Sequence, residues 1–261
     1  MATLTGAHAD RIARVRDLRS AKGSKEHGRF AFEGPTLLEE ALRSGVAIEE
    51  LYATQSVYES SGRLRALEAL GTRVFLVDER TSAKISDLET PPGLLAVAAR
   101  RLATVSEAAA GRLTLVLADL NDPGNVGTLL RSAEAFGVTG VVLGRLGVDP
   151  YHPKVVRGAM GAVFRLPLAV AEPDELWAAP APPVVLGLAA GGEDITRAEL
   201  GERTALVVGH ERRGLGLWEP GCTALTGIPM TGLSESLNAA VAGSVALYAL
   251  SRRMSRESSA R

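Results

Sequence analysis

The sequence predicts an α/β protein with two domains, and two observations lead to this prediction. Short apolar stretches of strand length alternate with segments of helical periodicity along most of the chain. Hydrophobic residues make up 46% of the sequence but aromatic residues only 4%, so small and branched side chains must form most of the core. Such a core suits packed layers of helices and sheet, and 261 residues suffice for two domains of roughly 100–150 residues.

The first predicted domain covers residues 1–105. It begins with a frayed terminus at 1–10, a short helix at 11–20 and a polar, glycine-containing segment at 21–29 that predicts a mobile basic loop. Further helices are predicted at 36–44, 57–70 and 81–88, and strands at 48–53, 73–77 and 94–99.

The second predicted domain covers residues 106–261 and follows a partly helical linker at 103–111. Its predicted strands lie at 113–118, 138–143, 184–188, 205–208 and 224–228, and its predicted helices at 127–136, 154–163 and 236–252.

Charge is balanced overall but clustered locally. The chain has 29 basic and 30 acidic residues, so net charge argues neither for nor against nucleic acid. Seven cations nevertheless fall between residues 11 and 29, opposed only by Asp17 and Glu26. Because phosphate contacts dominate nucleic-acid affinity, this segment predicts RNA binding, with a solvated helix face as the alternative. The candidate RNA-binding residues are Arg11, Arg14, Arg19, Lys22, Lys25 and Arg29.

Cysteine and histidine usage bounds the chemistry. Cys222 is the only cysteine, which excludes an internal disulfide, and the four histidines lack ligand spacing, so we expect no metal. The sequence has neither a signal-peptide pattern nor a run of about 20 apolar residues, so we expect a cytoplasmic protein that does not interact with membranes.

A first motif lies at 117–138, where a predicted strand runs through Asn-Asp-Pro-Gly-Asn-Val-Gly into a helix. Pro123 and Gly124 predict a tight turn, and the free amides of the helix start predict an anion site. Arg131, four residues into the predicted helix, would project toward that anion. An ordinary strand–turn–helix unit is the alternative, and a nucleotide-binding loop fits poorly because the first glycine of GxGxxG is missing.

Two further motifs follow. In 205–216 an apolar strand ends at Gly209 with Glu211 two residues on, and open α/β sheets bind ligands at such strand ends. In 227–252 an apolar strand end precedes Ser234 and Ser236, either of which can cap the last helix and so place Asn238 in its first turn. Taken singly, each motif is also explained by a surface turn or a capped core helix.

Together the three motifs are much more specific. The stretches NDPGNVGTLLRSAEAFG, GHERRGL and IPMTGLSESLNAAVA resemble the SpoU/TrmH family of RNA 2′-O-ribose methyltransferases, within the SPOUT superfamily, over about residues 113–252. Phe30-x-x-Glu33-Gly34 is similar to the opening of a small α/β substrate-binding domain, related to a ribosomal protein, that many members carry. The resemblance implies a C-terminal α/β domain with a deep trefoil knot.

The resemblance also implies the chemistry. Members transfer a methyl group from S-adenosylmethionine to a ribose 2′-hydroxyl, without a metal, as homodimers whose active site draws on both subunits. Backbone around Gly209, Ile228, Met230 and Leu237 is expected to hold the methyl donor. The expected catalytic residues are Arg131, Asn125, Glu211, Ser236 and Asn238. Arginine normally stays protonated, so we expect Arg131 to clamp an RNA phosphate and stabilise developing negative charge, although a role as base stays open.

The sequence leaves the RNA undetermined. The extra N-terminal domain favours ribosomal RNA, and 23S rRNA in particular, over transfer RNA, by analogy only. A catalytically silent RNA-binding or ribosome-assembly protein of the same fold is a further alternative. Two departures from the family pattern, His210 after the glycine of the second motif and Ala240 in place of a common serine, put contacts from those positions in doubt.

Overall fold

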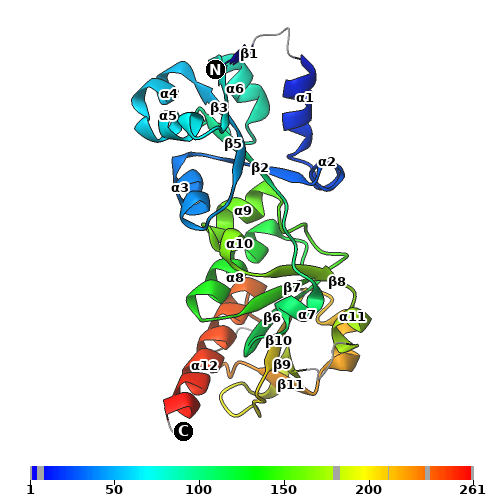
Figure 1. Ribbon diagram of the computed structural model, residues 1–261. Helices are drawn as coiled ribbons and strands as arrows, with labels where there is room; N and C mark the ends of the chain where they lie inside the picture. The colour runs from blue at the N-terminus through cyan, green and yellow to red at the C-terminus, as the bar shows by residue number, and fades with distance from the viewer. Residues whose placement is uncertain (1, 5–8, 179–182, 211, 233–235, 260–261) are drawn as a thin grey trace. The chain divides into compact units, whose positions relative to one another are not determined.

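A computed structural model describes residues 2–4, 9–178, 183–210, 212–232 and 236–259, and the chain forms two compact units (Figure 1). Unit 1 comprises Met1–Arg101 and Tyr151–Phe164, and unit 2 comprises Leu102–Pro150 and Arg165–Arg261. The predicted α/β class is confirmed, because each unit is a sheet with helices packed on it.

Unit 1 contains a five-stranded mixed sheet in the order β1-β4-β3-β5-β2. β3 runs parallel to β4 and antiparallel to β5, which in turn pairs antiparallel with β2. The strands are β1 (Ala2–Leu4), β2 (Arg29–Glu33), β3 (Ile48–Thr54), β4 (Arg73–Val77) and β5 (Leu94–Ala99). The helices are α1 (Ala9–Asp17), α2 (Ala21–His27), α3 (Pro35–Arg43), α4 (Gln55–Ser60), α5 (Gly62–Ala69), α6 (Glu79–Ile85), α9 (Pro153–Ala159) and the start of α10 (Ala162–Arg165).

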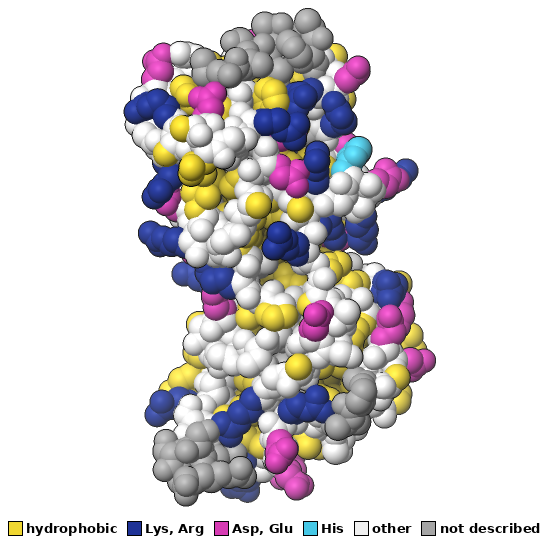
Figure 2. Space-filling view, viewed as in Figure 1, with side chains coloured by type: hydrophobic (Ala, Val, Ile, Leu, Met, Phe, Trp, Pro, Cys, Tyr) yellow, Lys and Arg dark blue, Asp and Glu magenta, His cyan; other side chains and the backbone are white. Residues whose placement is uncertain are grey.

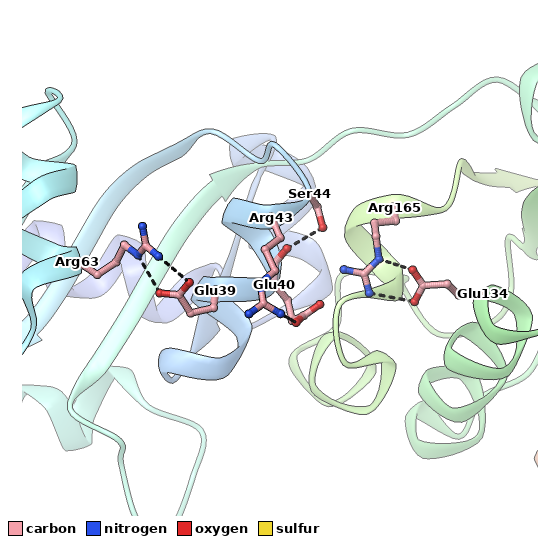
Figure 3. Close-up of polar contacts among 7 residues, drawn as sticks. All are labelled: Glu39, Glu40, Arg43, Ser44, Arg63, Glu134 and Arg165. Atoms are coloured by element: carbon pink, nitrogen blue, oxygen red, sulfur yellow. Dashed lines mark hydrogen bonds and ion pairs between the residues drawn. The ribbon is translucent and has the colours of Figure 1, made fainter.

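Both faces of this sheet are covered. α1 buries Val15, and the turn after it buries Leu18, against Tyr52 and Phe75, because the apolar residues recur at helical spacing. The opposite side carries an aromatic cluster in which Phe30 lies 4.5 Å from Tyr151, ring centre to ring centre. That contact, with the packing of α9 on β2, explains why 151–164 belongs to unit 1. Polar contacts add to the surface of the unit, among them the ion pair of Arg63 on α5 with Glu39 on α3 (Figure 3).

Three local predictions for these segments were wrong. The expected loop at 21–29 is helix α2 followed by the start of β2, because Ser20 caps the helix by accepting from the Gly23 amide at 2.9 Å. The expected helix 57–70 is two helices that meet at Ser61, whose hydroxyl caps the second. The expected helix 154–163 is broken by left-handed backbone at Met160, where φ is 48°.

Unit 2 contains a six-stranded sheet in the order β11-β9-β10-β6-β7-β8, in which all pairs are parallel. The strands are β6 (Leu113–Ala118), β7 (Gly140–Gly144), β8 (Leu168–Ala171), β9 (Val184–Asp194), β10 (Thr204–Gly209) and β11 (Ala224–Gly227). The helices are α7 (Val105–Ala108), α8 (Pro123–Ala135), α11 (Pro173–Trp177), α12 (Ala239–Ser259) and the 3₁₀ helix η2 (Gly216–Gly221). β8, α11 and η2 had no counterpart in the predicted elements.

The two faces of the second sheet are packed differently. On one face Trp218 of η2 is fully buried with Leu176 of α11 in a cluster of small residues. On the other, α12 runs beside α8 (Figure 1), and the Ser132 and Ser244 hydroxyls lie 2.7 Å apart between these two helices. A methyl group at Gly243 would lie 2.5 Å from Cδ2 of Leu129, so a larger residue there would require the Leu129 side chain to move. Within the described ranges, no helix is long and apolar enough to cross a membrane.

Candidate functional site

The first two sequence motifs leave neighbouring strands at the same edge of the unit 2 sheet. β10 pairs with β6 in register, with Val208 opposite Leu117 and Gly209 opposite Ala118. From this pair the sheet continues in opposite directions, to β7 and β8 on one side and to β9 and β11 on the other. Open α/β sheets bind ligands at such a switch point, outside the carboxyl ends of the strands.

Asp119, directly after β6, ties the loops at this edge together. Its backbone is left-handed, with φ of 53°, and its carboxylate accepts from the Leu146 amide at 3.2 Å and from the Trp218 indole at 3.3 Å. The loops that follow β6 and β7 and the helix η2 therefore converge on one side chain. Sequence reasoning missed Asp119, although an acidic residue directly after a six-residue buried strand was a visible signal.

The first motif starts its helix earlier than predicted. α8 begins at Pro123 rather than at residue 127, because Asp122 caps it by accepting from the Asn125 amide at 2.7 Å and Pro123 suits the first helical position. The Asp122 carboxylate thus occupies the helix start where an anion site was expected. Arg131 lies eight residues beyond Pro123, about 12 Å along the helix axis instead of one turn from the loop.

Arg131 lies on the exposed side of α8 and, among the described residues, forms no ion pair or hydrogen bond. Glu134, one turn further along, is not available to neutralise it. Arg165 engages both oxygens of Glu134, with Nη2 donating to Oε2 at 3.0 Å (Figure 3). The Arg131 guanidinium is therefore free to bind an anion from outside the described chain.

The first and third motifs meet through two asparagines. The Asn238 side-chain amide donates to the side-chain oxygen Oδ1 of Asn125 at 3.1 Å. The Asn238 oxygen also accepts from the backbone amides of Ala240 at 2.9 Å and Val241 at 3.2 Å, so Asn238 itself caps α12. The prediction that Ser234 or Ser236 caps this helix and that Asn238 lies in its first turn was wrong.

A pocket of about 280 Å³ lies beside these motifs. All four residues predicted to hold the methyl donor line it, namely Gly209, Ile228, Met230 and Leu237, and Ser236 lines it too. At Gly209 an added methyl group would lie 2.4 Å from the Gly214 carbonyl oxygen, so this wall is backbone without a side chain. Asn125, Asn238 and Arg131 are not among the described residues that line the pocket.

The electrostatics of the pocket are simple. No lysine or arginine is among the described residues that line it, and Glu219 on η2 is the one carboxylate among them. His210 also lines it, and its Nδ1 accepts from the Arg212 amide at 3.1 Å. Burial and the nearby Glu219 charge raise the pKa of the Cys222 thiol to about 11, so this cysteine stays protonated at neutral pH. Sequence reasoning singled out neither Glu219 nor a lining role for His210.

Glu211, predicted to be catalytic, lies outside the described residues. Within the described residues no group of three or more histidine, cysteine, aspartate or glutamate side chains is placed to hold a metal ion.

The predicted RNA-binding residues are in unit 1, and Figure 2 shows many lysine and arginine side chains on the face of that unit in view. Several of the predicted cations have acidic partners. Arg11 pairs with Glu50 at 3.3 Å and Arg29 with Glu49 at 2.8 Å. Lys22 pairs with Glu26 one helical turn away, at 3.8 Å. The basic segment is therefore not a uniform set of free cations.

Comparison with known proteins identifies both units. Residues 112–248 match the SpoU rRNA Methylase family, and residues 9–96 match the MRM3-like substrate binding domain. The chain is 30% identical to the 23S rRNA (guanosine(2553)-2′-O)-methyltransferase RlmP of Bacillus subtilis, over 96% of this chain and 99% of that protein.

Two solved structures cover nearly the whole chain. The AdoMet-bound rRNA methyltransferase from Sinorhizobium meliloti has a TM-score of 0.84 at 28% identity, covering 97% of both chains. The SpoU methyltransferase AviRb from Streptomyces viridochromogenes, in complex with the cofactor AdoMet, has a TM-score of 0.82 at 26% identity, covering 94% of this chain and 97% of that one. The predicted family is confirmed: this chain belongs to the SpoU rRNA Methylase family.

Proposed function

We propose that this protein transfers a methyl group from S-adenosylmethionine to a ribose 2′-hydroxyl of ribosomal RNA. One observation carries the proposal more than any other. The four residues expected to hold the donor come from two separate motifs, 205–216 and 227–252, yet they line one pocket at the switch point of the sheet. The names of RlmP and of the AdoMet-bound structures support the same reaction class and the same donor.

The pocket residues fit this donor. S-adenosylmethionine carries a positively charged sulfur, and the described lining brings no cation against it and one carboxylate, Glu219. Apolar side chains such as Leu215 and Ile228 suit an adenine ring, and the bare backbone at Gly209 permits hydrogen bonds to main-chain groups. When bound, the donor supplies an electrophilic methyl carbon whose sulfur leaves as a neutral thioether.

The chain must position the ribose hydroxyl and stabilise the oxygen as it loses its proton. We assign Arg131 to clamp an RNA phosphate beside the reacting ribose and to stabilise developing negative charge. The Asn125–Asn238 pair, held by the caps of α8 and α12, would orient the ribose or the arginine. Ser236 would complete the hydrogen bonds at the pocket, and Glu211 would anchor the donor loop or the arginine.

A homodimer is part of this proposal. Leu237, Val241, Val245 and Tyr248 are 38–53% exposed and recur at helical spacing at the start of α12 and along it. Such an apolar face suits burial against a second copy. Because Arg131 lies about 12 Å from the start of its own helix, a dimer in which it serves the partner's pocket would account for its distance from the loop. We also propose the trefoil knot that the resemblance implies for residues 106–261, and assign RNA recognition to residues 1–105.

The substrate follows from the relatives only as a class. Ribosomal RNA, and 23S rRNA in particular, is favoured by the name of RlmP, while transfer RNA and a silent RNA-binding role are the outcomes that a test must separate. The cytoplasmic location expected from the sequence stays a prediction.

Methyl transfer is tested with methyl-tritiated S-adenosylmethionine and, in separate reactions, unmodified ribosomal RNA and bulk transfer RNA. We expect label in ribosomal RNA, with one nucleotide resistant to alkaline cleavage. Arg131→Ala should lower the turnover number by about 100-fold or more, the size of effect seen when one oxyanion donor is removed. Arg197→Ala is the matched control, since Arg197 is an exposed arginine elsewhere in unit 2. Donor binding without label in either RNA would favour the silent role, and unimpaired turnover in Arg131→Ala would contradict the assignment of the arginine.

A further inference from the structure

A second pocket, of about 170 Å³, lies in unit 1 and has a different chemistry. It is lined by α1, the end of α2, and the starts of β2 and β4. Its basic lining residues are Arg11, Arg14, His27, Arg29 and Arg73. Arg73 is distant in sequence from the basic segment at 11–29, so only the fold brings these side chains together.

A buried carboxylate orients two of the arginines. Glu50 on β3 is only 7% exposed. It forms an ion pair with Arg73 at 2.8 Å and accepts hydrogen bonds from Arg11 at 3.3 Å and from the Tyr52 hydroxyl. Arg73 is also its register partner on β4. Because a buried carboxylate is strongly destabilising without partners, the Arg11 and Arg73 guanidinium groups are held in place before any ligand arrives. Arg11 is fixed further by stacking over Phe75, 4.3 Å from the ring centre.

The pocket keeps an excess of positive charge. Glu50 is shared by two arginines, and Glu49 pairs with Arg29 at 2.8 Å. Arg14 is exposed and, within the described part of the chain, has no acidic partner. Four arginines therefore face two carboxylates. The described lining has two further titratable side chains, Tyr52 and His27, and His27 lies 3.3 Å from Asp17.

We propose that this pocket binds a phosphate group of the RNA backbone, with Arg14 and Arg73 as its principal ligands; this inference rests on the proposed RNA methyltransferase function. Arg73 is held by Glu50, and the Arg14 charge has no acidic partner among the described residues. Guanidinium groups match the geometry of phosphate oxygens. A base is a poorer fit, because Tyr52, the one phenylalanine, tyrosine or tryptophan among the described lining residues, is 1% exposed and offers no face for stacking. The site lies in the unit that matches a substrate binding domain.

This proposal changes what is expected of the basic segment. Arg19, Lys22 and Lys25 do not line the pocket, and the Lys22 side chain is 84% exposed and paired with Glu26. The predicted cations should therefore contribute unequally to RNA affinity. Arg73, which the sequence did not single out, should matter more than Lys22.

The test measures binding of the full chain to a transcript of unmodified 23S ribosomal RNA at several salt concentrations. For Arg14→Gln we expect an affinity loss of about 5- to 10-fold at low salt and a salt slope reduced by about 1, since one phosphate contact is lost. Arg73→Gln should behave alike, and Arg73→Lys should keep the pairing with Glu50 but lose the two-pronged contact and recover only part of the affinity. Lys22→Gln is the matched control, with a change of less than about 2-fold and an unaltered slope.

Thermal unfolding and S-adenosylmethionine affinity are measured in parallel. Among the described residues Arg14 has no partner whose loss would disturb folding, so an unchanged unfolding temperature with weakened RNA binding supports the proposal. Equal losses in Arg14→Gln and Lys22→Gln would overturn it in favour of a diffuse basic surface. Inorganic phosphate is the second probe: if it competes with RNA only in the wild type and not in Arg14→Gln, the pocket is the phosphate site. If it binds there without displacing RNA, the pocket is a free-anion site and the proposal is wrong.

Different results would contradict the proposed function and the proposed phosphate site. A wild-type chain that binds S-adenosylmethionine but no RNA at any salt concentration would contradict the proposed function and this inference together. A wild-type chain that binds and methylates RNA while Arg14→Gln binds it equally well would contradict this inference alone.

Discussion

The donor pocket in unit 2 and the arginine-lined pocket in unit 1 differ in the chemistry of their walls. The unit 2 pocket is walled by backbone and apolar side chains and has one carboxylate among its described residues. The unit 1 pocket is walled largely by guanidinium groups, and the buried Glu50 carboxylate pairs with two of them, those of Arg11 and Arg73. The first selects by shape and main-chain contacts, whereas the second selects by charge and is less dependent on shape. A substitution that changes the shape of the unit 2 pocket should therefore weaken binding of its ligand. A rise in ionic strength should weaken ligand binding in the unit 1 pocket.

The largest loss of ligand affinity is expected from a substitution that disturbs the backbone wall of the unit 2 pocket. Gly209→Ala adds a methyl group 2.4 Å from the Gly214 carbonyl oxygen, and backbone cannot move aside as a flexible side chain can. We expect S-adenosylmethionine affinity to fall by about 100-fold or more, roughly 3 kcal/mol, measured by titration calorimetry.

Gly232→Ala is the matched control for this change, because a methyl group there meets no atom of the described residues within 4 Å. Wild-type affinity in Gly209→Ala would mean that the donor does not use this wall. RNA affinity should be unaffected in both variants if the two pockets are independent.

A second expected difference is in salt dependence. RNA binding should weaken by about 10-fold or more between 50 and 200 mM salt if several phosphates are contacted, because counterions are released on binding. S-adenosylmethionine binding should change by less than about 2-fold over the same range, since the donor pocket has few charges to screen. Equal salt dependence of the two ligands would mean that charge does not distinguish the two pockets.

The sequence predicted the parts of the site that depend on local pattern. Strand 94–99 was predicted with the bounds it has, and the four residues expected to hold the donor, which strand ends and a family pattern pointed to, line one pocket. Helix starts were harder. Pro123 and Gly124 suggested a turn, but Asp122 provided a cap that made them the first helical turn instead.

Long-range contacts could not be predicted from local sequence patterns. No local pattern shows that Arg73 lies opposite Glu50, or that the Asp119 carboxylate accepts hydrogen bonds from the loop after β7 and from η2. These contacts depend on the order of strands in the sheet. Segment 21–29 was mistaken for a loop because its polar composition outweighed the Ser20 cap. Glycine inside such a helix costs only about 1 kcal/mol, which a cap and packing offset.

A smaller effect is expected from the asparagine that joins motifs one and three. Asn238→Ala removes the cap of α12 and the hydrogen bond to Asn125, and we expect the free energy of unfolding to fall by about 1 kcal/mol. Asn238→Asp keeps an oxygen for the cap but has no amide to donate to Asn125. Stability near that of the wild type with reduced turnover in Asn238→Asp would separate capping from catalysis. A loss of stability with unchanged turnover in Asn238→Ala would assign the residue to capping alone.

The smallest effect on donor affinity is expected from Glu219, which lines the donor pocket. Glu219 is exposed at its edge, and we expect it to pair with the ammonium group of S-adenosylmethionine. Glu219→Gln should weaken donor binding by about 2- to 5-fold, the size of a solvent-exposed ion pair. 5′-Methylthioadenosine, which lacks the amino-acid part, is the control ligand, and its affinity should not change. Equal losses for both ligands would place Glu219 against the adenosine part, and the one carboxylate among the pocket's described residues would then recognise hydroxyl groups instead of charge.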